Sequence, residues 1–185
     1  MKKRLTLIQM DVHVNDVEYN YNRVQELLTQ SLSESPDIIV LPETWNTGFY
    51  PSKELINIAD RNGERTKSLL SAFAKEYNVN IVGGSVAVAK NDVVFNTSYI
   101  YNRKGKLVGE YSKMHGFSPA KEDYYFAGGT HTTHFELDGI PCSTVICYDI
   151  RFPELVRMAA LPNTKLLFVP AQWPTMRLRH WQVLN

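Results

Sequence analysis

The sequence predicts an α/β fold in which mixed sheets are covered by helices. Stretches with apolar residues at helical spacing alternate with short apolar stretches that are typical of strands. Turn sequences such as Asn91-Asp92 and Asp138-Gly139 join neighbouring strands, so antiparallel hairpins interrupt the alternation. Residues 37–41, DIIVL, are apolar enough for a strand that is covered on both faces. At least one sheet should therefore have helices packed against it.

The first half of the chain supplies the alternating strands and helices. The predicted elements are a strand over 4–10, a helix capped by Asn15 or Asp16, a strand over 37–41, a loop over 42–51, and helices over 55–60 and 64–77. The first helix has one apolar stripe, which consists of Val17, Tyr21, Val24, Leu28 and Leu32. This stripe should pack against the sheet.

The second half is predicted to begin with hairpins and to return to strand–helix alternation. One strand is expected over 80–89, where Gly83-Gly84 indicates a bulge or a close backbone approach. The later elements are strands over 94–101, 107–111, 133–137 and 140–147, a helix over 152–161, a strand over 165–169, and a helix from residue 178. The chain stops in the first turns of that helix. We therefore expect a single domain over residues 1–185 whose C-terminal part is missing.

Composition excludes several classes of protein. The 185 residues suffice for one domain with a sizeable core, and 44% hydrophobic with 21% charged residues is ordinary for a soluble protein. A net charge of +1 gives no reason to expect nucleic acid as a partner. An apolar run of about 18 residues, as a membrane span needs, does not occur. The N-terminal apolar run is short and interrupted by Gln9 and Asp11, so it reads as a strand and not as a signal peptide.

The two cysteines, Cys142 and Cys147, are expected to remain unpaired. On one predicted strand, five residues apart, they would face opposite sides at a separation of about 16 Å. A disulfide requires Cα atoms within about 7 Å. Two unpaired thiols favour a reducing, cytoplasmic setting.

Residues 140–154, IPCSTVICYDIRFPE, place Cys147 where a predicted strand ends and a turn begins. A strand holds such a residue rigidly, while the turn exposes its sulfur beside a free backbone N–H group, as a nucleophile requires. The alternative is a small buried apolar residue, which is the role of most free cysteines.

Two further strand ends carry charged residues. Glu43 follows the buried strand at 37–41 and lies near Trp45 and Phe49, where desolvation would raise its pKa and suit it as a general base. The alternative for Glu43 is a helix or loop cap. Lys113 ends another strand and could stabilise an oxyanion, although most loop lysines are simply solvated. Together with Cys147, these residues are the parts that an amide hydrolase needs.

The segments LPETWNTGF, YSKMH and VICYDIRFPE resemble, in order and spacing, the three signature segments of the nitrilase superfamily. Members of this superfamily are carbon–nitrogen hydrolases with a Glu-Lys-Cys triad. The segment AQWPTMRLRHW is similar to the omega-amidase branch, which hydrolyses terminal amides of 2-oxo dicarboxylic acid monoamides. The resemblance covers nearly the whole chain. It implies an α-β-β-α sandwich, a thioester mechanism, and a second glutamate, for which Glu122 in KEDYYFAGG is the match.

The resemblance also implies a role for each residue. Glu43 would take the proton of Cys147, while Lys113 and the backbone N–H of Tyr148 would hold the oxyanion. Glu122 would orient Lys113 or the substrate nitrogen. No cofactor and no metal is required. His131 and His134 flank a predicted strand start, so a metal site there is not favoured.

A substrate with a free carboxylate needs a cation, and the candidates are Arg177, Arg151 and Lys121. Arg177 ranks first because it shares the branch-specific loop with Trp173, whereas Arg151 has an alternative partner in Glu154. The predicted partner is a small-molecule amide. The alternatives are an N-carbamoyl compound or another carboxamide as substrate, and a truncated, inactive scaffold.

The family resemblance further implies a homodimer. Its contact would be formed by the helices near 152–161 and after 178. Leu155, Met158 and Leu178 are the apolar residues expected to be available for it.

Overall fold

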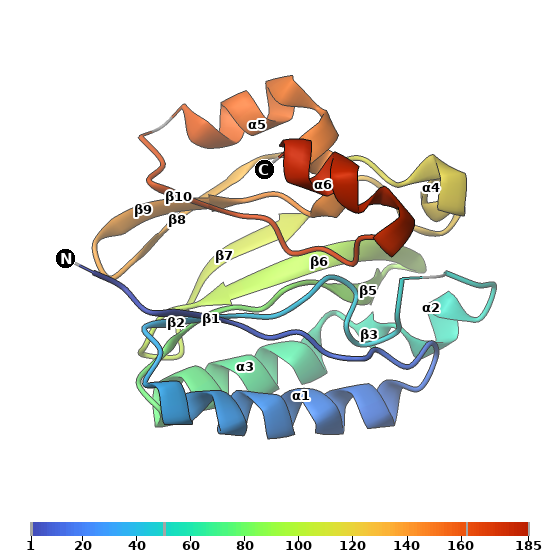
Figure 1. Ribbon diagram of the computed structural model, residues 1–185. Helices are drawn as coiled ribbons and strands as arrows, with labels where there is room; N and C mark the ends of the chain where they lie inside the picture. The colour runs from blue at the N-terminus through green and yellow to red at the C-terminus, as the bar shows by residue number, and fades with distance from the viewer. Residues whose placement is uncertain (1, 50, 162, 185) are drawn as a thin grey trace.

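Two sheets lie face to face between two layers of helices in the computed structural model, which describes residues 2–49, 51–161 and 163–184 (Figure 1). Helices α1 (Val17–Ser31) and α3 (Glu64–Glu76) cover the outer face of the larger sheet. Helix α5 (Pro153–Ala160) covers the smaller sheet, and α6 (Leu178–Leu184) lies on the same side. The predicted α/β fold, and the α-β-β-α arrangement that the resemblance implied, are confirmed.

The larger sheet has seven strands in the order β1-β2-β4-β6-β5-β3, with β7 paired to β6. Its strands are β1 (Leu5–Leu7), β2 (Ile38–Val40), β3 (Asp60–Arg61), β4 (Asn80–Val82), β5 (Val86–Lys90), β6 (Val93–Tyr101) and β7 (Leu107–Ser112). Strands β1, β2 and β4 run parallel, because helices connect them, whereas β6 is antiparallel to β4, β5 and β7. The loops after β2 and β7 both lead toward the site.

The smaller sheet has the order β10-β9-β8. Strands β8 (Thr133–Leu137) and β9 (Ile140–Thr144) form the predicted hairpin around Asp138 and Gly139, and both turn residues have positive φ. Strand β10 (Leu166–Phe168) pairs parallel to β9 after the crossover through α5. The short helices are α2 (Leu55–Ile58), α4 (Glu122–Tyr125), and the 3₁₀ segments η1 (Leu32–Glu34), η2 (Ser118–Ala120), η3 (Cys147–Arg151) and η4 (Thr175–Arg177).

Strand β2 is buried on both faces, as its apolar sequence predicted. Ile39 packs in the core beneath α1 and α3, together with Tyr21 and Leu28 of α1. Ile38 and Val40 point the other way, into the core between the two sheets. Asp16 caps α1 by accepting a hydrogen bond from the Tyr19 N–H, which fixes where the helix begins.

The single strand expected over 80–89 is wrong, because the glycine pair divides it into β4 and β5. Gly84 has a φ of +61°, and a Cβ there would lie 2.0 Å from the carbonyl oxygen of Pro42. Only glycine permits this approach. The carbonyl of Gly83 also accepts a hydrogen bond from the Trp45 indole, 2.9 Å. The break in the strand therefore seats the loop that carries Glu43.

The strand expected over 140–147 is also too long. Strand β9 ends at Thr144, and Cys147 begins η3 with a φ of +46°. The chain turns because the Asp149 carboxylate accepts the N–H of Ile146, 3.1 Å, which a continuing strand would have used. Cys142 and Cys147 therefore do not share a strand, although both are free thiols as predicted.

Several other expectations need smaller corrections. The helix expected over 55–60 ends at Ile58, because Asp60–Arg61 pairs with β5 as the short strand β3. Leu155 is only 4% exposed and packs against Val145 and Ala159, so it is a core residue and not a surface contact. Among the described residues, no helix is long and apolar enough to cross a membrane.

Candidate active site

Three loops at the ends of β2, β7 and β9 bring Glu43, Lys113 and Cys147 to one place between the sheets. The Lys113 Nζ lies 2.7 Å from Glu43 Oε1. Both charged groups act electrostatically on the Cys147 thiol: Glu43 raises its pKa, and Lys113 lowers it. The strand ends that the sequence singled out therefore meet in space.

Glu43 is completely buried, and its loop is fixed on both sides. The Thr44 N–H donates to Ser85 Oγ, 3.0 Å, while the Trp45 ring is buried in the core. On the carboxylate, Oε2 accepts the N–H of Gln172, 3.0 Å, and Oε1 accepts from Lys113. These partners lie on distant segments, so Glu43 does not have the alternative role of a local helix cap.

Lys113 is 3% exposed and therefore is not the solvated loop lysine that its position also allowed. Its ammonium contacts both oxygens of Glu122, at 2.9 and 2.7 Å, in addition to Glu43. Burial on its own would lower the pKa of Lys113, but the attraction of the two carboxylates outweighs burial and raises it. The lysine is charged at every physiological pH.

Glu122 lies in α4, inside the stretch that the sequence left irregular, and it is 1% exposed. Its Oε2 accepts the N–H of Phe117, 2.7 Å, as well as the lysine ammonium. The carboxylate thus holds the loop after β7 against the site. The residue that matched the second glutamate of the family is placed beside Lys113.

Asn96, in the middle of β6, is a site residue that the sequence reasoning missed. Its Nδ2 donates to Glu43 Oε1 and to Glu122 Oε1, both at 3.1 Å. The signal was a polar amide in the otherwise apolar first half of VVFNTSYIY, at a position that is 1% exposed. A buried amide in a central strand needs polar partners.

The turn that carries Cys147 is held by the buried carboxylate of Asp149. Asp149 accepts hydrogen bonds from the Tyr111 hydroxyl, 2.7 Å, and from the His115 N–H, 2.9 Å, besides that of Ile146. Tyr111 and His115 flank Lys113 along the chain. One carboxylate therefore ties the cysteine turn to the end of β7, which fixes the cysteine relative to the lysine.

The Cys147 thiol is 4% exposed and keeps its proton at neutral pH. Burial raises its pKa well above the ordinary value, and the negative charge of Glu43 raises it further, while Lys113 only partly offsets the two. Burial is also the largest cause for Cys142 and raises its pKa to about 11, but no carboxylate–ammonium pair among the described residues acts on Cys142.

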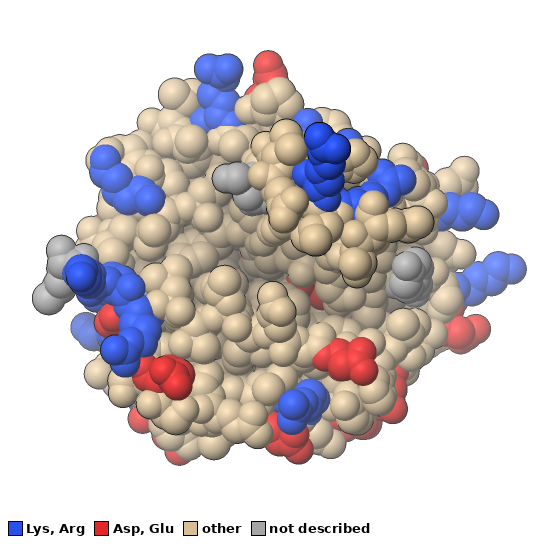
Figure 2. Space-filling model, in the orientation of Figure 1, with Lys and Arg blue, Asp and Glu red and all other residues tan. Residues whose placement is uncertain are grey.

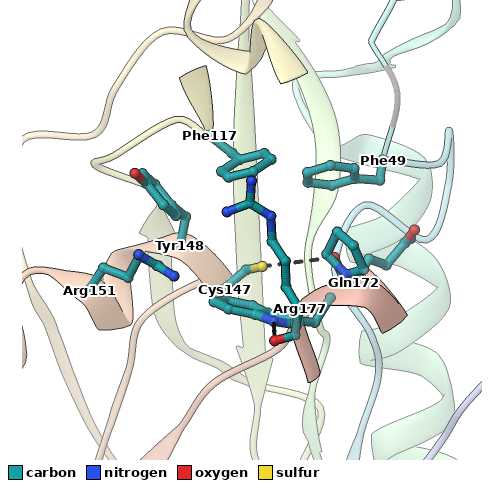
Figure 3. Close-up of a pocket in the computed structure, with 9 residues that line it drawn as sticks. Phe49, Phe117, Cys147, Tyr148, Arg151, Gln172 and Arg177 are labelled. Carbon is teal, nitrogen blue, oxygen red and sulfur yellow. Dashed lines mark hydrogen bonds between the residues drawn. The ribbon is translucent and has the colours of Figure 1, made fainter. Parts of the chain in front are cut away.

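A pocket with aromatic walls opens above the sulfur of Cys147 (Figure 3). It encloses about 280 Å³ of empty space, part of it open to solvent. Its lining residues are Phe49, Phe117, Cys147, Tyr148, Arg151, Gln172, Trp173, Pro174 and Arg177. The structure thus brings the predicted substrate-binding residues Arg151, Trp173 and Arg177 to the same pocket as Cys147.

Two guanidinium groups lie against the rings of this pocket. The Arg177 guanidinium lies 5.3 Å from the centre of the Phe117 ring, and that of Arg151 lies 5.8 Å from the Tyr148 ring and 6.0 Å from the Trp173 ring. The described part of the chain offers neither arginine an ion pair, so Arg151 does not form the alternative pair with Glu154 that the sequence allowed. Both positive charges remain available to a ligand.

The other candidate residues lie away from the pocket or contribute only backbone. Lys121 is exposed at the turn before α4 and does not line the pocket, so it is the weakest of the three cations. Tyr148 follows Cys147 in the first turn of η3, where backbone N–H groups have no partner within the helix. His131 and His134 are exposed, and the described ranges contain no group of three residues that could hold a metal.

The face shown in Figure 2 is hollowed near its middle, where uncharged side chains predominate, and most of its charged side chains lie toward the rim.

Comparisons of this chain with known families, sequences and structures agree on one family. The carbon–nitrogen hydrolase family model matches residues 4–185. The 2-oxoglutaramate amidase of Bacillus subtilis is 40% identical over 184 residues, which are 100% of this chain and 70% of that protein. The omega-amidase NIT3 of Saccharomyces cerevisiae is 27% identical over 99% of this chain and 68% of that protein. The crystal structure of Saccharomyces cerevisiae Nit3, a member of the nitrilase superfamily, superposes with a TM-score of 0.87 at 26% identity, covering 98% of this chain and 69% of that chain. The resemblance to this superfamily and to its omega-amidase members is confirmed.

Proposed function

This chain belongs to the carbon–nitrogen hydrolase family, and we propose that it hydrolyses the terminal amide of a 2-oxo dicarboxylic acid monoamide to the acid and ammonia. The observation that carries the proposal is the position of Cys147. Its sulfur lies beside a buried carboxylate–ammonium cluster and opens into a pocket with two unpaired arginines. The relatives named 2-oxoglutaramate amidase and omega-amidase support the same substrate class.

The first half of the proposed reaction forms a thioester. Glu43 takes the thiol proton of Cys147, and the sulfur adds to the amide carbon. The Lys113 ammonium and the backbone N–H of Tyr148 stabilise the oxyanion that develops, as charged and oriented donors do. The tetrahedral adduct collapses when Glu43 returns the proton to the nitrogen, so the C–N bond breaks and ammonia leaves.

The second half regenerates the thiol. Water adds to the thioester carbon and loses a proton to Glu43, which then passes that proton to the leaving sulfur. Glu122 keeps Lys113 in position throughout, because it contacts the ammonium with both oxygens, at 2.9 and 2.7 Å. Four of the chain's own residues and one backbone N–H supply every group that this sequence of steps requires.

Arg177 and Arg151 are proposed to bind the free carboxylate of the substrate. Both guanidinium groups lie over aromatic rings of the pocket that opens on Cys147. An arginine fork matches a carboxylate in geometry as well as in charge.

An N-carbamoyl amino acid is the second candidate substrate, because it also combines a carboxylate with a carbonyl bonded to nitrogen. The two candidates differ in where the carbonyl lies relative to the carboxylate. Complete hydrolysis of the carbamoyl group would release a free amine together with carbon dioxide and ammonia, whereas hydrolysis of the terminal amide releases ammonia and the dicarboxylic acid. Product analysis therefore separates them.

Ammonia release from a panel of compounds tests the proposal. The panel contains the 2-oxo dicarboxylic acid monoamide, the neutral amide of equal length without its carboxylate, and an N-carbamoyl amino acid. We expect the monoamide to give the highest kcat/KM, and loss of its carboxylate to cost at least about tenfold, as removal of a charged hydrogen bond does. Cys147→Ala should abolish release. A chain that hydrolyses none of these compounds would instead support the inactive scaffold.

We also propose a homodimer in the cytoplasm. Exposed apolar side chains gather on α5 and α6 and the segments beside them: Met158, Leu161, Leu178 and Val183 are 54%, 72%, 50% and 78% exposed. Burial of such residues in a contact is favourable. Sedimentation should give a dimer at micromolar concentration, and Met158→Lys should shift it toward monomer. The two free thiols fit a reducing compartment.

A further inference from the structure

Asn96 places its side-chain amide between the two carboxylates of the site. Its Nδ2 lies 3.1 Å from Oε1 of Glu43 and 3.1 Å from Oε1 of Glu122. The reverse orientation of the amide is excluded, because its carbonyl oxygen would then face two carboxylate oxygens with no hydrogen between them. Asn96 therefore gives one hydrogen to each carboxylate.

The backbone of Asn96 is held more firmly than a loop residue would be. Strand β6 is paired on one side with β5, where Asn96 lies opposite Ala87, and on the other side with β7. The Asn96 carbonyl accepts the N–H of Lys113, 2.9 Å. The Asn96 amide and the Lys113 ammonium, which contact both carboxylates, therefore belong to residues whose backbones are hydrogen-bonded to each other in the sheet.

The charges of the cluster do not balance without a further donor. Glu43 and Glu122 carry two negative charges against the one positive charge of Lys113, and all three are at most 3% exposed. Water cannot screen the excess charge at such burial. The N–H dipoles of Asn96 add positive potential between the carboxylates without adding a group that titrates.

Fold stability does not account for this amide. Among the described residues, the Oδ1 of Asn96 has no hydrogen-bond partner although it is buried. An unpaired buried acceptor destabilises a protein, and an apolar side chain of similar shape would remove it. The Asn96 amide therefore stabilises the two carboxylates, although its own unpaired oxygen lowers the stability of the fold.

We propose that Asn96 is a positioning residue: its amide fixes the Glu43 carboxylate against Glu122 in the orientation in which Glu43 can accept the Cys147 proton. This inference rests on the proposed amide hydrolysis at Cys147. Without the amide, the excess negative charge of Glu43 and Glu122 would be less compensated at the Cys147 sulfur. The thiol proton would then be lost only at a higher pH, and Glu43 would no longer be fixed in the orientation that accepts it.

Three variants of the full chain test this role: Asn96→Leu, Asn96→Asp and, as a control, Asn80→Leu. Asn80 is matched to Asn96: it is a fully buried strand asparagine whose Oδ1 also has no partner within the described ranges. It begins β4, at the end of the sheet away from the Glu43 loop, and its Nδ2 donates to the Asp37 carbonyl, 3.0 Å. Circular dichroism and urea unfolding show which variants fold.

The first readout is the rate at which iodoacetamide alkylates Cys147, followed by peptide mass spectrometry as the pH is raised. Alkylation begins as the thiol proton of Cys147 is lost. A third carboxylate in Asn96→Asp should move this onset to higher pH by about 1–3 units, and Asn96→Leu should move it less but in the same direction. Asn80→Leu should overlay the wild-type curve.

The second readout is steady-state turnover of the amide. Asn96→Leu should lower kcat by about 10- to 100-fold, the value of a hydrogen bond to a charged group. The KM should change little, because Asn96 does not line the pocket that holds the arginines. A loss of stability alone would reduce the active fraction and leave both KM and the pH of half-maximal rate unchanged.

Each outcome either supports or overturns the proposed role of Asn96. If folded Asn96→Asp matches the wild type in the onset of alkylation, the positioning role is wrong, and this holds whether or not an amide is turned over. If the wild type alkylates at Cys147 but hydrolyses no compound of the panel, the proposed function fails while the onset still decides the role of Asn96. A shift in Asn80→Leu equal to that of the Asn96 variants would also overturn the inference.

Discussion

Lys113→Met removes the only ammonium that contacts the two buried carboxylates among the described residues. Glu43 and Glu122 are 0% and 1% exposed, so neither can be rehydrated without opening the site. Removal of one partner from a buried ion pair costs about 3–5 kcal/mol, because the other charge stays desolvated. We therefore expect Lys113→Met to lower the free energy of unfolding by about this amount at about pH 8.

The loss should shrink as the pH falls. Without the ammonium, burial and mutual repulsion hold the folded-state pKa of the carboxylate pair above the unfolded value of about 4.3. The folded state then binds more protons than the unfolded state, so the free energy of unfolding decreases as the pH rises through the raised folded pKa. The variant should accordingly recover stability between about pH 8 and pH 5, where a proton neutralises part of the excess charge.

Urea unfolding followed by tryptophan fluorescence measures this effect, since Trp45 is fully buried beside the site loop. Lys106→Met is the control: this lysine is exposed in the turn before β7, and its replacement should change the free energy of unfolding by at most about 0.5 kcal/mol. If Lys113→Met is as stable as the wild type at about pH 8, or gains stability as the pH rises, the electrostatic account of the site is wrong.

Three further predictions concern the two thiols, the cysteine turn and the surface. Iodoacetamide should abolish turnover by modifying Cys147. Cys142→Ala should lower the free energy of unfolding by about 1 kcal/mol and leave the rate per folded molecule unchanged. Labelling that prefers Cys142 would contradict this prediction. Asp149→Asn keeps the size of a carboxylate that accepts hydrogen bonds from Tyr111, His115 and Ile146. It should lower kcat at least about tenfold with little change in KM, as steady-state kinetics will show. Asp138→Asn removes a carboxylate whose pKa is lowered by Arg103. The variant should therefore have a free energy of unfolding about 1 kcal/mol below that of the wild type above about pH 4. This difference should diminish as the pH falls through the lowered pKa, and it should shrink in high salt.

The sequence predicted the layers and the three strand ends of the site because both depend on local patterns. A wholly apolar strand such as Ile38–Val40 is buried on both faces, so the polar residue that follows it stands out. Glu43 follows this strand, Lys113 directly follows β7, and Cys147 lies shortly after the end of β9. Their catalytic roles stay predictions that the variants above can test.

The errors arose where a distant contact overrides the local pattern. Residues 140–147 have the β-branched composition of a strand, but Asp149 captures the Ile146 N–H and turns the chain early. The glycine pair was seen as a close approach, yet only the position of the Pro42 carbonyl shows that it divides the strand. Asn96 was overlooked for the same reason, since its two partners lie 53 and 26 residues away.

The excess negative charge of the site explains why the base must be a neighbouring carboxylate. Glu43, Glu122 and Lys113 together carry one net negative charge, and loss of the thiol proton to solvent would raise it to two in a buried space. This cost is why the pKa of Cys147 lies well above its ordinary value. Transfer of the same proton to Glu43 leaves the net charge of the site unchanged. In the proposed mechanism the thiolate therefore forms only as its proton moves to Glu43, when a carbonyl carbon lies within reach of the sulfur.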